Sequence, residues 1–108
     1  MREVYSTHHI LWQKSEWNTG YARKLRAVFS RQIPDNIHKE LHKELRGLPV
    51  PSGDVLRKCW EDYQKDRDEI DAYDVFRACA WLYVHIPDHA FRSAMHWQID
   101  FFATKKPP

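Results

Sequence analysis

The stretch IPDNIHKELHKELRG, residues 33–47, determines the most sharply predicted element of this chain. Pro34 and the two polar residues after it are typical of a helix start, because the first turn needs no N–H from proline and its φ angle suits a helix. Gly47 is typical of the position that follows a helix end. Apolar residues recur at four-residue spacing on one face: Ile37, Leu41 and Leu45. The stretch therefore predicts an amphipathic helix that begins near Pro34 and ends at Gly47.

The same helix carries His38 and His42, which share one helical face because they are four residues apart. Upstream, His8 and His9 are adjacent in EVYSTHHILW, residues 3–12, where β-branched and aromatic residues predict extended structure. Two adjacent imidazoles can divide their roles, so that one binds a metal while the other acts as a general base. The four histidines together are the candidate site for metal-assisted hydrolysis.

Helical patterns account for most of the remaining chain. Helices are expected over residues 21–29, 52–65, 72–85 and 88–103, loops or connectors over 13–18 and 48–51, and a solvated turn or helix end over 65–71. The side chains expected to face the core are Leu25, Val28, Phe29, Val55, Leu56, Cys59, Trp60, Tyr63, Val75, Phe76, Cys79, Leu82, Tyr83, Phe91, Met95 and Phe102. We predict a mainly α chain with a small N-terminal β element, folded as a single domain over residues 1–108.

Four tryptophans lie outside this simple pattern. Trp12 and Trp17 follow the His8-His9 segment, and either pack against the histidine helix or stack on nucleobases. Trp81 and Trp97 lie off the expected apolar stripes, which favours a surface for an oligomer or a partner. The sequence leaves the oligomeric state open.

Composition restricts the class of protein. No apolar run approaches the roughly 18 residues of a membrane-spanning helix, and the first residues lack the apolar stretch of a signal peptide. Cys59 and Cys79 are the two cysteines, and their spacing is not that of a CxxC motif. They are expected to be buried, reduced thiols, and the protein is expected to be cytoplasmic.

Charge is distributed unevenly along the chain. Residues 1–46 contain nine Lys and Arg against five Asp and Glu, whereas residues 47–108 contain eight against ten. The basic half also contains the four candidate histidines, so a polyanion such as nucleic acid would be attracted to that half. The candidate phosphate contacts are Arg23, Arg26, Arg31 and Lys39. The alternative interpretation is a solvated basic face with no ligand.

The order of these motifs resembles that of the HNH, or ββα-metal, nuclease family, and is most similar to the colicin-type branch whose metal ligands are all histidines. The resemblance covers roughly residues 5–46 and includes the Ile33-Pro34 step before the helix. It implies a finger over residues 1–47, followed by a helical portion over 52–104. The HHI-to-HxxLH layout is also similar to that of small actinobacterial and phage proteins, which implies a setting more than an activity.

The resemblance implies a role for each histidine. His8, His38 and His42 would bind a divalent metal (zinc, magnesium, manganese or nickel), and His9 would be the general base that activates water. The middle Asn or His of the family motif has no clear counterpart, since Ser30 or Arg31 stands at about its place. The Gly-rich loop of the family is also missing.

These motifs and the resemblance suggest two functions that can be tested. The first is an HNH-like metal-dependent endonuclease that hydrolyses phosphodiester bonds of nucleic acid, with DNA favoured over RNA. The alternative is a non-catalytic binding protein of a phage or mobile element that inhibits or regulates a host protein or a nucleic-acid process. A plain helical protein without a metal is a third possibility. The remaining histidines, His85, His89 and His96, are interpreted as incidental, because Pro87 interrupts the His85–His89 spacing.

Overall fold

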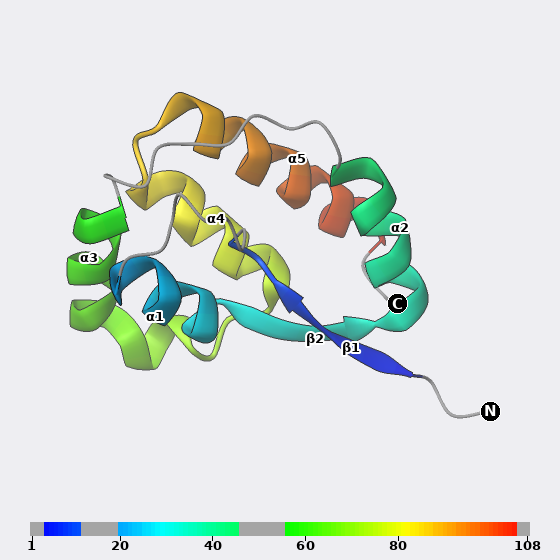
Figure 1. The fold of residues 1–108 in the computed structure, drawn as a ribbon, viewed down its shortest axis with the longest axis horizontal. Helices are drawn as coiled ribbons and strands as arrows, with labels where there is room; N and C mark the ends of the chain where they lie inside the picture. Colours follow the sequence, from blue (N-terminus) through cyan, green and yellow to red (C-terminus); the bar gives the residue numbers. More distant parts are fainter. Residues whose placement is uncertain (1–3, 12–19, 46–55, 106–108) are drawn as a thin grey trace.

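The structure is a computed structural model, and it describes residues 4–11, 20–45 and 56–105. In these ranges the chain forms a two-stranded sheet and five helices (Figure 1). The elements are β1 (Tyr5–His9), α1 (Gly20–Val28), β2 (Ser30–Pro34), α2 (Asp35–Leu45), α3 (Leu56–Ile70), α4 (Val75–His85) and α5 (His89–Lys105). The prediction of a mainly helical chain with a small N-terminal β element is confirmed.

Several predicted features lie outside the described residues. They are the loops predicted at 13–18 and 48–51, Trp12, Trp17, Gly47, Val55 and the tail after Lys105. Among the described helices, none combines the length and the apolar character that crossing a membrane requires.

The two strands are antiparallel and lead directly into the histidine helix. β1 and β2 pair over five residues, with His8 opposite Arg31. The Asp35 N–H donates a hydrogen bond of 2.7 Å to the Val4 carbonyl, so the first residue of α2 is joined to β1. Since β2 ends at Pro34 and α2 begins at Asp35, no loop separates the strand from the helix. The position of α2 relative to β1 is therefore fixed by backbone hydrogen bonds.

β2 is a strand that the residue pattern did not indicate. Its sequence, SRQIP, offers one buried apolar side chain, Ile33, and too little alternation to signal a strand. The strand forms because β1 supplies a hydrogen-bonding partner from about 25 residues away, and Ile33 then packs into the core. Tertiary pairing overrides the weak local preference here.

The charged run 65–71, expected to be a turn or a helix end, forms the end of α3, which continues to Ile70. Asp66 alone departs from helical backbone angles (φ −119°, ψ 16°), and it marks a kink. The helix continues past the kink because its last residue, Ile70, is buried in the core, while the charged side chains of residues 66–69 stay exposed. The free energy gained by burying Ile70 explains why this charged sequence is helical.

The core includes side chains from both halves of the chain. Phe29, at the end of α1, stacks on Trp81 of α4 and meets Tyr63 of α3 edge-on, with ring centroids 5.6 Å apart in each case. Trp81 and Trp97 are both partly buried and pack against the core, although they lie off the expected apolar stripes. The expectation that Tyr83 faces the core is also wrong, since this side chain is 36% exposed.

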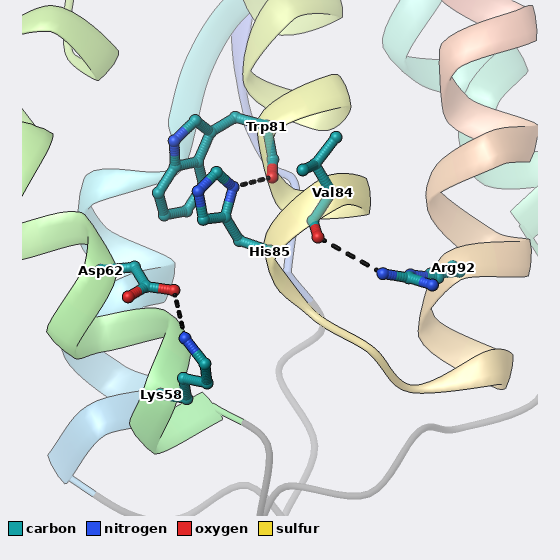
Figure 2. Close-up of polar contacts among 6 residues, drawn as sticks. All are labelled: Lys58, Asp62, Trp81, Val84, His85 and Arg92. Carbon is teal, nitrogen blue, oxygen red and sulfur yellow. Dashed lines mark hydrogen bonds and ion pairs between the residues drawn. The ribbon is translucent and has the colours of Figure 1, made fainter.

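The turn between α4 and α5 is held by side chains that bond to backbone groups. In Figure 2, Arg92 reaches back to the Val84 carbonyl, and its guanidinium also donates to the carbonyls of Tyr83 and Ile86. The Figure also shows His85 stacked on Trp81, with its ring nitrogen bonded to the Trp81 carbonyl at 2.9 Å. These contacts give His85 a structural partner.

Candidate metal centre

Three histidines from two distant segments converge at the junction of β1 and α2. His8 lies on β1, and His38 and His42 lie on consecutive turns of α2. Each of these side chains offers one nitrogen, and the three nitrogens all lie within 4.8 Å of one another. The three histidines are therefore close enough to bind one metal ion. We call them the histidine cluster.

Strand geometry directs His8 into the cluster. Side chains alternate across a strand, so His8 points inward and is 1% exposed, while His9 points outward and is exposed. The ring of His8 meets those of His38 and His42 edge-on, with centroids 5.6 and 6.3 Å away. On another side, the Phe102 ring of α5 lies 5.7 Å from it.

Helix geometry pairs the other two members. His38 and His42 lie at i and i+4 and meet edge-on, with ring centroids 4.4 Å apart and their Nε2 atoms 2.8 Å apart. Leu41, between them in sequence, is fully buried and anchors α2 to the core. His38 is half-buried and His42 is exposed, so the cluster is closed on the His8 side and open at the α2 surface.

The two ring nitrogens of His8 have different environments. Nε2 lies 3.0 Å from the side-chain oxygen of Gln98, another residue that is 1% exposed. Nδ1 is buried and has no hydrogen-bond partner in the described structure. Buried nitrogens without a partner are rare, because they lose their bond to water and gain nothing in exchange. Nδ1 is therefore the atom that best indicates a missing ligand.

Burial keeps the cluster in the form that binds metal. Burial is the largest cause that lowers the pKa of His8 from 6.5 to about 4; the Gln98 bond opposes the shift, and the neighbouring histidines add to it. The pKa of His38 is also lowered, by burial first and by His42 second. Both imidazoles are neutral at pH 7, and a neutral imidazole has the free electron pair that a metal needs.

The spacing of the nitrogens fits a metal ion. Two imidazole nitrogens on one tetrahedral zinc lie about 3.3 Å apart, close to the 2.8 Å between the Nε2 atoms of His38 and His42. Three protein nitrogens would leave coordination positions for water or substrate, as in catalytic sites rather than closed structural ones. The donor set, the spacing and the unpartnered Nδ1 of His8 are thus mutually consistent.

The predicted general base lies beside the cluster but outside it. His9 is exposed at the end of β1, opposite Ser30. After the larger effect of burial, its charge contributes to lowering the pKa of both His8 and His38, so its imidazole lies within electrostatic reach of the cluster. Strand alternation separates its side chain from that of His8.

The candidate phosphate contacts are placed differently from one another. Arg31 donates to four backbone carbonyls, which are those of Val28, Ser30, Ile70 and Tyr73. We therefore assign it a structural role at the junction of β2 with the turn after α3. Lys39 is 75% exposed and pairs with Asp35 at 3.1 Å. Arg23 is exposed and Arg26 is half-buried, both on α1.

Sequence reasoning missed Gln98. It lies on α5 in register with the apolar residues of that helix, at the spacing 91, 95, 98 and 102, and it is buried among them. A polar residue in an apolar stripe is costly unless it has hydrogen-bond partners, so this break in the pattern was a signal that could have been used.

Comparison with protein-family models, with curated proteins and with solved structures finds no match to this chain.

Proposed function

We propose that this protein binds a divalent transition metal at the histidine cluster and hydrolyses phosphodiester bonds of nucleic acid, as an HNH-like endonuclease. The observation that carries the proposal is the buried, unpartnered Nδ1 of His8 in a ring that lies against His38 and His42. A three-nitrogen site that is open to solvent on one side suits hydrolysis better than a purely structural role.

The order of elements supports the family resemblance. Two antiparallel strands followed directly by a helix, with one ligand on β1 and two on α2, agree with a ββα-metal finger. Here α1 stands between the strands, in place of a Gly-rich loop. The two residues near the place of the middle Asn are bonded to the backbone: Ser30 donates to the Arg26 carbonyl, and Arg31 donates to backbone carbonyls such as that of Val28.

The ligand set favours some metals over others. Imidazole nitrogens suit zinc and nickel, whereas magnesium prefers oxygen ligands, so zinc and nickel are the first candidates and magnesium the last. When bound, such an ion would polarise a phosphate oxygen and lower the pKa of a water molecule.

The residues around the cluster have separate parts in the proposed reaction. His9, which is exposed, would accept the proton of the attacking water. Lys39 is exposed on α2, where it would hold a phosphate near the cleaved bond, and Arg23 is exposed on α1, where it would contact the nucleic-acid backbone farther from the cluster (Figure 1). DNA is the proposed substrate and RNA the second choice.

Supercoiled-plasmid nicking tests the proposal directly. Purified protein is assayed with zinc, nickel, manganese and magnesium, beside His9→Ala and His89→Ala. Both substitutions remove an exposed histidine, one beside the cluster and one at the start of α5. We expect nicking by the wild type and by His89→Ala, and loss of nicking in His9→Ala with metal affinity retained. Equal nicking by both variants would remove His9 from the reaction.

A second function is favoured by one observation, the outward position of His9. Because His9 and His8 point to opposite faces of β1, the cluster can bind a metal without a base beside it. The protein would then be a metal-stabilised binding protein of a phage or mobile element that acts on a host protein or a nucleic acid. Metal binding without nicking under any metal would favour this function.

A further inference from the structure

Gln98 connects the last helix to the histidine cluster. His8 and Gln98 are 90 residues apart in sequence, and both are 1% exposed. Figure 1 shows the C-terminal part of α5 beside α2, and an ion pair of 2.8 Å between Lys105 and Glu40 joins the two helices. The Gln98 amide is thus a buried contact between α5 and His8, the buried member of the histidine cluster.

The orientation of the Gln98 amide follows from its other neighbours. The amide nitrogen faces the Ile10 carbonyl at 3.4 Å, and a carbonyl oxygen can only accept a hydrogen bond. The amide oxygen must then face His8, with the thiol of Cys79 as a second donor at 3.9 Å. Reversing the amide would place its nitrogen against the ring and its oxygen against the carbonyl, where two acceptors would meet.

This orientation determines the tautomer of His8. An amide oxygen accepts but cannot donate, so the His8 nitrogen that faces it at 3.0 Å, Nε2, must carry the proton. A neutral imidazole has one protonated nitrogen, which leaves Nδ1 with a free electron pair. Nδ1 is the same atom that is buried without a partner.

We infer that Gln98 is a positioning residue: it holds His8 in the Nε2-protonated tautomer, so that Nδ1 is the nitrogen presented to a metal beside His38 and His42. The inference rests on the proposed metal site and adds the residue that orients it. Partners of this kind, on the far nitrogen of a ligand histidine, typically change metal affinity about tenfold to a hundredfold when removed.

The tautomer is measured first, on the metal-free protein. Long-range ¹H–¹⁵N NMR of the labelled chain at pH 7.5 with chelator resolves the protonated nitrogen of each ring. We expect the Nε2-protonated form for His8 in the wild type and a mixture of tautomers in Gln98→Leu. A wild-type His8 protonated at Nδ1 would overturn the inference whatever the metal affinity.

Zinc affinity is measured next, by competition with a chromophoric chelator, in three variants. Gln98→Leu places an apolar side chain in an apolar stripe, so the fold is retained while the acceptor is lost; thermal melts in chelator check this. We expect about a tenfold to hundredfold loss of affinity in Gln98→Leu and recovery in Gln98→Glu, because a protonated carboxyl group can donate to the Ile10 carbonyl and still accept from His8. Gln64→Leu, at an exposed position of α3, is the matched control and should bind as the wild type does.

The outcomes separate the two proposals. If the wild type binds no zinc or nickel, the proposed function is overturned, while the NMR result still decides the tautomer. If the wild type binds zinc and Gln98→Leu binds it equally well, the role of Gln98 is overturned and the metal site stands. Loss in Gln98→Leu with no recovery in Gln98→Glu would indicate altered packing and would also overturn the positioning role.

Discussion

Two pairs of histidines in this molecule have the same four-residue spacing and different environments. His38 and His42 are on one continuous helix, with a third imidazole, that of buried His8, against them. His85 and His89 lie at the end of α4 and the start of α5, with Ile86 to Asp88 between the helices. The first pair retains the common face that the spacing suggests, and the second does not.

The contacts of the imidazole rings also differ between the two pairs. His85 stacks on the Trp81 ring at a centroid distance of 4.0 Å and bonds to the Trp81 carbonyl, so its flat face and one nitrogen are used inside the protein. The nitrogens of His38 and His42 face each other. Spacing alone therefore does not identify a metal site. A third ligand from a distant strand, with a nitrogen left unpartnered, is the more specific feature.

The largest expected difference between the pairs is in metal affinity. We expect His42→Ala to weaken zinc binding by about a hundredfold to a thousandfold, since structural zinc sites gain roughly 3–4 kcal/mol per ligand. His89→Ala should leave the affinity unchanged. Both side chains are exposed, so neither change is expected to disturb the core. Equal affinities in a zinc competition assay would remove the distinction between the pairs.

The acid stability of the metal-free protein gives a second contrast. The pKa of buried His8 is lowered from 6.5 to about 4, so the unfolded chain takes up a proton at a pH where the folded chain does not. The stability contributed by this difference is present above pH 6.5 and is lost as the pH falls to about 4, with a total of about 3 kcal/mol.

Urea denaturation in chelator between pH 7 and pH 4 measures this loss. His8→Gln should show about 3 kcal/mol less acid destabilisation than the wild type, whereas His89→Ala should show the wild-type slope. Carboxylates such as Asp35, whose pKa is lowered mainly by its bond to Ser6, contribute to the slope in both proteins and cancel in the difference. An identical slope in His8→Gln would contradict the burial of a neutral His8.

Metal should also stabilise the fold through the first pair only. At a zinc concentration one hundred times the Kd, binding adds about 2.7 kcal/mol to the free energy of unfolding. For a chain of 108 residues, this raises the Tm by about 10 °C. Differential scanning fluorimetry with and without chelator checks the shift, which we expect in His89→Ala and not in His42→Ala. A shift of the same size in His42→Ala would place the bound zinc elsewhere.

The smallest effect concerns the stacked member of the second pair. We expect His85→Ala to destabilise the protein by about 1 kcal/mol, through loss of the Trp81 stacking and one hydrogen bond. Zinc affinity should not change. Chemical denaturation and the chelator competition assay measure the two quantities on the same sample. A fall in zinc affinity would show that His85 affects zinc binding at the histidine cluster.

Local patterns predicted the parts of this site that depend on neighbours in sequence. The i and i+4 relation of His38 and His42, and the burial of Leu41 on the same helix, follow from helix geometry alone. The inward direction of His8 and the outward direction of His9 follow from strand alternation, but which of the two is inward depends on the packing of β1. The sequence could name both residues but could not choose between their faces.

The parts that remained hidden depend on contacts between distant segments. β2 exists because β1 pairs with it, and the role of Arg31 depends on carbonyls at the end of α3, about 40 residues away. Gln98 meets His8 across 90 residues. None of these contacts produces a periodic pattern in the sequence, although the polar residue in the apolar stripe of α5 could be seen there. The predicted finger, residues 1–47, therefore left out Gln98, the residue that we propose orients His8.

The lack of a hydrogen-bond partner for Nδ1 of His8 among the described residues also affects which mutations the chain tolerates. A buried acceptor without a partner costs the metal-free fold roughly 1–3 kcal/mol, and a metal removes that cost when it binds. Apolar residues at both His8 and Gln98, which are hydrogen-bonded to each other, would remove this cost without any metal, at the loss of the site. Random mutagenesis selected only for thermal stability should therefore favour the paired replacement of His8 and Gln98, and at these two positions selection for stability and selection for metal binding would oppose each other.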